Sequence, residues 1–256
     1  MPLSANPPPG DVCVSLTDAT IGYGARAAVH HLSGQVRRGE LTAVVGANGS
    51  GKSTLIKCIA GLMRPISGDC RLSHLATAYM PQQSELDRSF PAQVRDVVAL
   101  GLWQSRGLLG RHRQADCDRI ARALQAIGLG GFETRSIDSL SGGQMRRALF
   151  ARVLVQDAAL ILLDEPFNAI DEQTIGDLLA LIHRWQAEGR TVIAVLHDLD
   201  LVRAHFPRSL LLARHSIAWG PTATVLTPEN LRRARRFRQN WEKDAAWCLE
   251  PSEQVA

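Results

Sequence analysis

The sequence predicts an α/β fold organised around a mixed, mainly parallel sheet. Three predominantly apolar runs, at residues 41–45, 160–163 and 191–196, are typical of parallel strands that are buried on both faces. Helix-compatible segments follow the first two runs, and residues 209–213 and 216–220 are later strand candidates that would close the sheet. A chain of 256 residues can bury the core of one large domain or of two small ones.

A phosphate-binding loop follows the first of these runs. Residues 46–54 (GANGSGKST) match the pattern G-x-x-x-x-G-K-[ST] between a predicted strand and a predicted helix. Glycines let the backbone turn its N–H groups toward an anion, and the helix N-terminus adds a positive dipole. This context disfavours a glycine-rich turn without a ligand and indicates a P-loop NTPase core. The predicted nucleotide contacts are Gly46, Asn48, Gly49, Ser50, Gly51, Lys52, Ser53 and Thr54.

A second candidate anion site lies far along the chain, at residues 140–144 (LSGGQ). Ser141 is a good N-cap for the helix that follows, and two glycines beside it would expose backbone N–H groups. A second site of this kind is unexpected in a chain that binds one nucleotide. Its residues are Ser141, Gly142, Gly143 and Gln144.

Polar side chains follow three of the predicted strands. Asp164 and Glu165 end an apolar strand, where Asp164 could hold Mg²⁺ and Glu165 could act as general base. His197 follows the next strand and would share their edge if the strands are neighbours, where it could donate a hydrogen bond to a γ-phosphate. Gln82 follows an earlier strand and could bind a metal or water through its carbonyl oxygen. Taken one at a time, each has a plainer interpretation: Asp164 and Glu165 as a strand cap, His197 as a structural histidine and Gln82 as a polar loop residue.

The remaining segments are less specific. Residues 12–16 alternate as an edge strand would, and a turn at 21–24 carries Tyr23, which could stack on a base or cap a hairpin. Residues 90–156 show apolar positions at helical spacing and indicate a helical insertion. Within it, the Gly- and Arg-rich residues 101–114 are expected to form a solvated loop.

Composition limits the classes of protein that the chain could represent. No apolar stretch approaches the length of a membrane-spanning helix, and residues 1–10 are expected to be a disordered leader rather than a secretory signal. The five cysteines show no ligand spacing and are expected to be reduced, buried thiols. The arginines within residues 232–238 are expected on a solvated helix face. Contact with anionic lipid or nucleic acid is the alternative, and Glu242 and Asp244 weaken the case for a nucleic-acid patch.

Together, these motifs resemble the nucleotide-binding subunit of ABC transporters, in the order and approximate spacing of that family, over residues 12–226. The resemblance implies a P-loop NTPase core with an antiparallel N-terminal β part and an inserted α-helical subdomain. The expected boundaries are 1–10 for the leader, 11–83 and 157–226 for the ATP-binding core, 84–156 for the helical subdomain with the LSGGQ signature, and 227–256 for a basic tail.

The resemblance also implies ATP and Mg²⁺ as ligands and a role for each motif. Tyr23 would stack on adenine, Asp171 would belong to the subunit-crossing loop, and the signature would bind the ATP of a second copy. The implied Mg²⁺ contacts are Ser53, Gln82 and Asp164, and the implied catalytic residues are Glu165, His197 and Gln82. Two copies would close head to tail on two ATPs and drive a membrane permease from the cytoplasmic face of the membrane, as peripheral subunits.

A finer resemblance concerns residues 86–101, where LDRSFP precedes VRDVVALG. This segment is similar to the permease-docking region of zinc, manganese and iron importers, which also use a periplasmic or extracellular substrate-binding protein. Importers of haem, siderophores or cobalamin carry a similar stretch and are the alternative. A soluble ABC-type ATPase acting on DNA or ribosomes is a remote alternative, and nucleic acid is not expected as a partner. Two departures from the family pattern, Ala47 and Asn168, affect no catalytic role.

Overall fold

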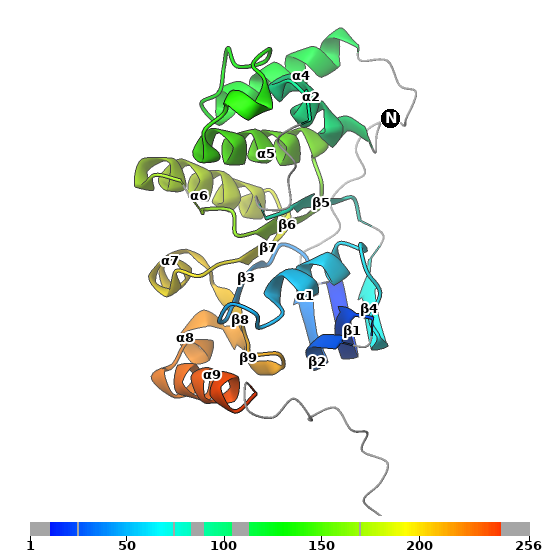
Figure 1. Ribbon diagram of the computed structural model, residues 1–256, viewed down its shortest axis with the longest axis vertical. Helices are drawn as coiled ribbons and strands as arrows, with labels where there is room; N and C mark the ends of the chain where they lie inside the picture. The colour runs from blue at the N-terminus through cyan, green and yellow to red at the C-terminus, as the bar shows by residue number, and fades with distance from the viewer. Residues whose placement is uncertain are drawn as a thin grey trace, which may run out of the picture.

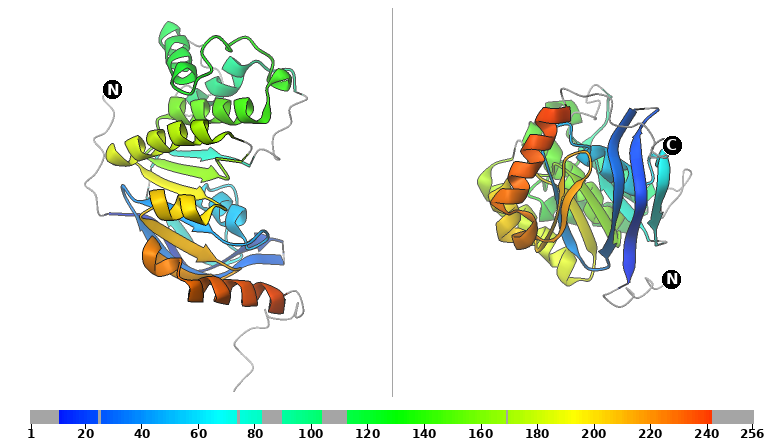
Figure 2. Two further views of the ribbon diagram at one scale, coloured as in Figure 1. Left: turned by 90° about the vertical axis from the view of Figure 1, so that its left-hand side faces the viewer. Right: turned by 90° about the horizontal axis from the view of Figure 1, so that it is seen from below.

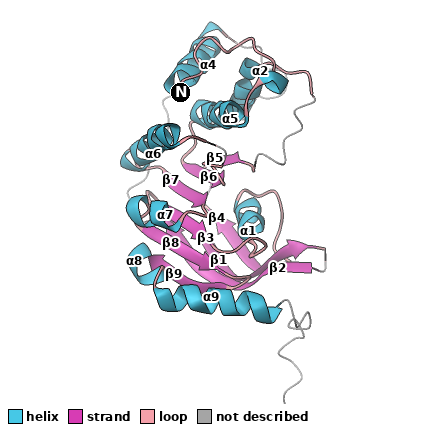
Figure 3. Ribbon diagram, turned by 60° about the vertical axis from the view of Figure 1, so that its left-hand side comes forward, coloured by secondary structure: helices cyan, strands magenta, loops and turns pink. Residues whose placement is uncertain are grey.

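The computed structural model describes residues 11–24, 26–73, 75–82, 90–103, 113–168 and 170–241. Two sheets form its centre, one with three strands in the order β2-β1-β4 and one with six in the order β5-β6-β7-β3-β8-β9. Helices α2 (Val94–Ala99), α4 (Gln114–Ala126) and α5 (Gly142–Gln156) lie beyond the β5 edge of the six-stranded sheet, and α9 (Pro228–Trp241) lies at its β9 edge, which gives an elongated molecule (Figures 1 and 3). This arrangement confirms the predicted α/β fold.

The six-stranded sheet positions the chemistry. Its first five strands run parallel, and β9 pairs antiparallel to β8. The pairing of β6 with β7 places Asp164 opposite Val195, so the acids after β6 and His197 after β7 share one edge, as predicted. Its strands are β3 (Leu41–Val45), β5 (Thr77–Met80), β6 (Leu160–Asp164), β7 (Thr191–Val195), β8 (Arg208–Leu212) and β9 (Ser216–Pro221).

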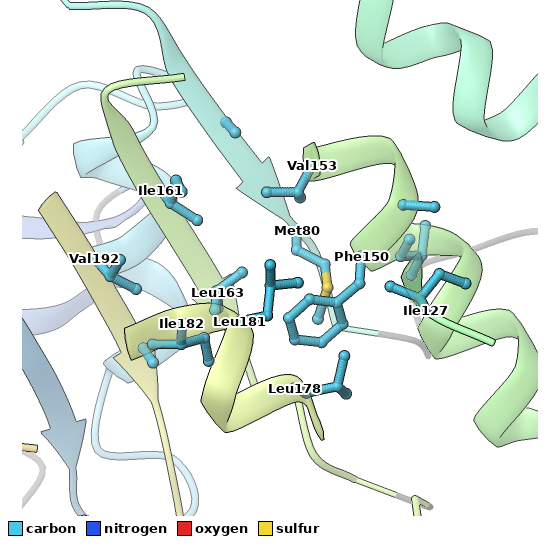
Figure 4. Close-up of a cluster of buried hydrophobic side chains, with 14 of the residues drawn as sticks. Met80, Ile127, Phe150, Val153, Ile161, Leu163, Leu178, Leu181, Ile182 and Val192 are labelled. Atoms are coloured by element: carbon cyan, nitrogen blue, oxygen red, sulfur yellow. The ribbon is translucent and has the colours of Figure 1, made fainter. Parts of the chain in front are cut away.

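The alternation of side chains along the parallel strands separates two hydrophobic cores. On β6, Leu160 and Leu162 face α1 (Lys52–Ile59) and the three-stranded sheet. Ile161 and Leu163 face the opposite core, in which Phe150 packs among aliphatic residues (Figure 4). Every residue of β6 is buried, which explains why its sequence is a continuous apolar run rather than an alternating one.

The three-stranded sheet corrects two expectations. β1 (Val12–Tyr23) is the central strand, paired antiparallel with both β2 (Arg26–Arg37) and β4 (Ser67–Leu72), so the prediction of an edge strand at 12–16 was wrong. The expected turn at 21–24 reduces to Gly24, because β1 continues through Tyr23. Register shifts within β1 break the alternation after residue 16 and hide the length of the strand in the sequence.

Helices dominate the described residues between 90 and 156, as predicted, and the one isolated β-bridge among them joins Gln93 and Ser136. The helices are α2 (Val94–Ala99), η2 (Leu100–Leu102), α4 (Gln114–Ala126), η3 (Ile137–Ser139) and α5 (Gly142–Gln156), which lie together beyond β5 (Figure 2). Side chains of α5 hydrogen-bond to the edge strand β5 and connect the helices to the sheet. Arg152 Nη2 donates to the Tyr79 carbonyl at 2.9 Å and Gln156 Nε2 donates to the Thr77 carbonyl at 2.8 Å. These bonds occupy main-chain acceptors at the edge of the sheet.

The expectation of a solvated loop over 101–114 was wrong at both ends. Gly101 and Leu102 are buried in η2, and a Cβ on Gly101 would lie 2.4 Å from the Arg152 carbonyl oxygen. Gln114 is the first residue of α4, and residues 104–112 lie outside the described part. A glycine in this segment therefore marks close packing against α5 rather than a flexible loop.

The C-terminal part contains α6 (Glu172–Ala187), α7 (Leu199–His205), α8 (Thr222–Val225) and α9 (Pro228–Trp241). The arginines of α9 at positions 232, 233, 235 and 236 are exposed, as expected of a solvated helix face. Cys13 and Cys58 are buried, but Cys117 is exposed, which corrects the expectation of buried thiols. The predicted leader and residues 242–256 lie outside the described residues. Among the residues that the structure describes, no helix is both long and apolar enough to cross a bilayer.

Candidate nucleotide-binding site

A cavity of about 600 Å³ opens at the carboxyl edge of the six-stranded sheet, beside the N-terminus of α1. It brings the phosphate loop together with the residues predicted after three different strands, and with one residue that was not predicted. Its lining consists of Asn48, Gly49, Gly51, Lys52, Ser53, Thr54, Gln82, Glu165, Asn168 and His197.

The backbone of the phosphate loop requires glycine for two separate reasons. Gly51 has φ +94° and is the N-cap of α1, and a Cβ there would lie 2.4 Å from Val29 Cγ2 and 2.6 Å from the Ala28 carbonyl oxygen. Gly49 has φ +77°, but a Cβ there would meet nothing within 4 Å. The loop therefore combines a close approach to β2 at Gly51 with a left-handed turn beside the cavity at Gly49.

Lys52 is held inside this loop. Its Nζ donates to the carbonyl oxygens of Gly46, at 3.0 Å, and Ala47, at 2.9 Å, and the residue is 5% exposed. Burial lowers the pKa of Lys52, while the nearby Glu165 and Asp164 carboxylates oppose that shift. The ammonium group is thus positioned at the floor of the cavity before any ligand arrives.

Three oxygen-bearing side chains converge beside Lys52. Ser53 Oγ donates to Asp164 Oδ1 at 3.2 Å across the gap between α1 and β6, and Asp164 is fully buried. Gln82 uses its amide nitrogen to contact Glu165, which leaves its carbonyl oxygen as the atom able to ligate a cation. Hydroxyl, carboxylate and amide oxygens are the donors that Mg²⁺ prefers, so the residues present fit that ion.

Glu165 is the centre of a hydrogen-bond cluster. Its Oε2 accepts from Gln82 Nε2 and Asn168 Nδ2, each at 2.5 Å, and its Oε1 lies 2.5 Å from His197 Nε2. Burial raises the pKa of Glu165, but the hydrogen bonds from His197 and Gln82 outweigh it and the net direction is downward. The residue also has φ +50°, an uncommon backbone conformation for a side chain other than glycine.

Other predicted residues lie elsewhere. Among the residues that the structure describes, neither Tyr23, which is 58% exposed, nor the LSGGQ segment lines the cavity. Ser141 caps α5, with Gln144 N donating to Ser141 Oγ at 3.2 Å and Ser141 N donating to Gln144 Oε1 at 3.0 Å. Gly142 and Gly143 form the first turn of α5.

Asp171 caps α6 rather than lining the cavity. Its Oδ1 accepts from Thr174 N at 2.9 Å and its Oδ2 accepts from the Thr174 hydroxyl at 2.8 Å. Both hydrogen bonds lower the pKa of Asp171, and the one from the Thr174 backbone N–H has the larger effect. The single chain therefore assembles the phosphate loop and the strand-end residues, but not the signature or the crossing-loop aspartate.

Two residues of the site were not predicted to belong to it. Asn168 lines the cavity and contacts Glu165, although the sequence identified it only as a departure from the family pattern. Arg146 is 1% exposed on α5, with Nε and Nη1 making no hydrogen bond within the described residues. Burial lowers the pKa of Arg146, and the charges of Glu165 and Asp164 counteract this. No sequence pattern distinguishes this buried arginine from Arg147 and Arg152, which are half-buried on the same helix.

Comparisons with known proteins agree with this site. Residues 29–168 match the family model described as ABC transporter. The chain is 37% identical to the manganese transport system ATP-binding protein MntB of Bacillus subtilis, over 90% of this chain and 95% of that protein. It is also 37% identical to the zinc transport system ATP-binding protein TroB of Treponema pallidum, over 86% of each chain.

Solved structures share the fold. One, an ABC transporter provisionally assigned to the metal-chelate type and inward-facing, is 29% identical with a TM-score of 0.78, over 88% of this chain and 90% of that one. A dimeric ATP-binding cassette with bound ADP and phosphate is 24% identical with a TM-score of 0.73, over 82% of this chain and 98% of that one. The chain belongs to the ABC transporter family, as an ATP-binding subunit with ATPase activity.

Proposed function

We propose that the chain is the ATPase of an importer that takes up a metal ion, zinc or manganese, through a partner permease. The observation that carries this proposal is the 37% identity with a manganese and a zinc transport ATPase over most of the chain. The similarity of residues 86–101 to the docking segment of metal importers supports it. Phe90, Leu100 and Trp103 are exposed apolar side chains around α2, as a docking surface requires.

A haem, siderophore or cobalamin importer is the second candidate. It is favoured by the likeness to the transporter of the metal-chelate type, at 29% identity. In either case the cargo would pass through the permease, and a binding protein outside the membrane would deliver it. The ATPase would lie at the cytoplasmic face of the membrane as a peripheral subunit, without nucleic acid as a partner.

ATP would lie with its phosphates against the N-terminus of α1. Lys52 would bind the terminal phosphates, exchanging its contacts to the Gly46 and Ala47 carbonyls for phosphate oxygens. Ser53, Gln82 and Asp164 would hold Mg²⁺, which when bound neutralises charge on the phosphate oxygens. Asn48, Gly49, Ser50 and Thr54 would contribute backbone and hydroxyl donors, and Tyr23 would stack on the adenine ring.

Glu165 would become a stronger general base after a rearrangement of its hydrogen bonds. Its two carboxylate oxygens are already engaged by three donors, from Gln82, Asn168 and His197. The hydrogen bonds from His197 and Gln82 lower the pKa of Glu165, so the loss of either one would make Glu165 a stronger proton acceptor for water. Gln82 and His197 are the donors with a second task, on the cation and on the γ-phosphate, so nucleotide binding would itself release the base.

The signature would complete the site of a second copy. Ser141, Gly142, Gly143 and Gln144 form a capped helix N-terminus, which suits a phosphate, and they do not line this chain's own described cavity. A head-to-tail homodimer would place each signature on the other copy's ATP, with Asp171 at the crossing. Residues 84–156 would form the subdomain that carries the signature toward the partner.

Glu165→Gln tests the ATPase mechanism. The amide keeps the shape of the side chain, its oxygen can accept from Gln82 and Asn168, and its N–H can donate to His197. The variant should therefore fold and bind ATP, while hydrolysis falls by about 10²–10⁴-fold. Size-exclusion chromatography with Mg-ATP should show a dimer for the variant and a monomer for the wild type after turnover. Hydrolysis at the wild-type rate would contradict the role of Glu165.

Growth of a strain that lacks this gene tests the cargo. Cells in chelator-depleted medium would receive zinc, manganese, iron, haem or cobalamin separately. Selective rescue by excess zinc or manganese, with plasmid rescue at low metal that depends on Glu165, supports the metal importer. Selective rescue by haem or cobalamin would transfer the assignment to the second candidate.

A further inference from the structure

A second cavity, of about 290 Å³, lies between helices α4, α5 and α6, and in the described part of the chain it shares no lining residue with the nucleotide cavity. The three helices lie one above another, with α5 in the middle (Figure 1). The floor of the cavity is apolar, because Val155, Leu181 and Trp185 line it and are at most 5% exposed. Its rim carries four arginines, which are Arg119 and Arg122 on α4, Arg184 on α6 and Arg190 just before β7.

Two of these arginines are held in place by the protein itself. Arg190 Nη2 lies 2.7 Å from Asp157 Oδ1, and Arg190 Nε donates to Glu188 Oε2 at 2.9 Å. Arg119 Nη2 lies 3.6 Å from the other carboxylate oxygen of Asp157, so one carboxylate contacts a guanidinium group from α4 and one from the residue before β7. Both cations are therefore largely ordered before a ligand arrives, which lowers the entropic cost of binding one.

The other two arginines are available to a ligand. Arg122 and Arg184 are exposed, and neither forms a hydrogen bond or an ion pair with another described residue. Asp157 and Glu188 offset two of the four arginine charges, so the cavity retains a net charge of about +2. This charge favours a phosphate monoester, which carries about −1.5 to −2 at pH 7, over a ligand with a single carboxylate.

We propose that this cavity is a binding site for a small phosphate monoester with an apolar body, separate from the nucleotide site. Guanidinium groups donate to phosphate oxygens in a planar fork, and such charge-assisted hydrogen bonds are stronger than neutral ones. The apolar body would lie against Leu181 and Trp185, where it is removed from water. A water molecule takes up about 30 Å³ in the liquid, so the cavity has room for about ten non-hydrogen atoms. A nucleotide is too large for this space.

The ligand would connect two parts of the chain. Arg119 and Arg122 belong to α4, whereas Arg184 belongs to α6, which follows the buried strand β6. Between them lies α5, whose N-terminus carries the LSGGQ segment, and its Phe150 stacks on Trp185 of α6 with the ring centroids 6.4 Å apart. A ligand held by both α4 and α6 binds only the folded chain, so it should raise the thermal midpoint of unfolding.

Calorimetric titration of the full chain with phenyl phosphate tests the site. ADP at a saturating concentration fills the nucleotide cavity, so that binding there does not contribute to the signal. Phenyl phosphate should bind about tenfold more tightly than inorganic phosphate, because its ring is buried against the apolar floor. It should also bind about tenfold more tightly than benzoate, which carries the ring but only one negative charge. An affinity no higher than that of either reference anion, or no binding at all, would overturn the proposal.

Matched substitutions test the location of the site. Arg122→Gln and Arg184→Gln each remove a charge that makes no contact in the fold, so both should keep the urea midpoint of wild type and bind phenyl phosphate about tenfold more weakly. Arg236→Gln, on the exposed face of α9, should bind it as wild type does. At one concentration of phenyl phosphate, the thermal midpoint should rise in wild type and Arg236→Gln and rise less in the other two variants. Wild-type affinity in Arg122→Gln and Arg184→Gln, or an equal loss in Arg236→Gln, means that the ligand does not occupy this cavity and the proposal fails.

Discussion

Alanine at Gly51 should destabilise the protein more than alanine at Gly49, although both glycines have positive φ angles. An alanine in the left-handed region costs about 1–2 kcal/mol at either position. Gly51 adds a steric conflict, because its Cβ would lie 2.6 Å from the Ala28 carbonyl oxygen and 2.4 Å from Val29 Cγ2. Overpacking of this kind costs about a further 1–3 kcal/mol. The expected losses are therefore about 2–5 kcal/mol for Gly51→Ala and about 1–2 kcal/mol for Gly49→Ala.

Equilibrium unfolding in urea without nucleotide measures both free energies, and the matched pair isolates the steric contribution. ATP binding provides a second measurement, because both glycines line the cavity. Gly49 lines the cavity, so its added methyl group should weaken ATP binding by about tenfold, or about 1.4 kcal/mol, while the fold stays close to wild type. Equal unfolding free energies for the two variants would refute the inferred close approach of the phosphate loop to β2.

Three further predictions concern stability. Phe150→Ala should lower the free energy of unfolding by about 3–5 kcal/mol, because it leaves a cavity in the hydrophobic core around Phe150. Trp103→Ala, at a residue that is 51% exposed, should lower it by less than about 0.5 kcal/mol. Similar urea midpoints for the two variants would contradict the placement of Phe150 in the core. Asp198→Ala should cost about 1 kcal/mol by thermal unfolding, because Asp198 Oδ1 accepts from Asp200 N at 2.9 Å at the start of α7. Burial lowers the pKa of both His30 and His215 below 6.5, and the charges of nearby arginines add to the effect. As the pH drops below 6.5 the unfolded chain therefore binds protons before the folded chain does, and the urea midpoint of unfolding should fall. If the fall in midpoint is no shallower in His30→Gln, His30 does not contribute to this pH dependence.

The strand ends were predictable from the sequence because parallel strands bury both faces. Continuous apolar runs identified β3, β6 and β7, and the polar residues after them marked one edge of the sheet. The proximity of Glu165 and His197 still required β6 and β7 to be neighbours. The pairing of β6 with β7 is a tertiary contact, because α6 separates the two strands in the chain. Local sequence patterns do not specify such a pairing.

The failures came from features that tertiary contacts decide. β1 became a central strand because β4 pairs with it from residues far along the chain, and its bulges remove the alternation that would have revealed it. Gly101 resembled a loop residue, but it is a site of close contact with α5. Arg146 could not be found because its burial depends on acids from another part of the sequence.

Arg146 also explains how the site tolerates its buried acids. Asp164 is fully buried and the Glu165 side chain is 10% exposed, so two carboxylates lie largely out of water. Lys52 at 5% exposure and Arg146 at 1% supply two positive charges beside them, and burial without such compensation would be costly for either sign. The four groups thus balance before nucleotide arrives. ATP without Mg²⁺ would add its full negative charge to this balanced site, whereas a bound Mg²⁺ offsets part of that charge, which is a physical reason for the proposed requirement for the ion.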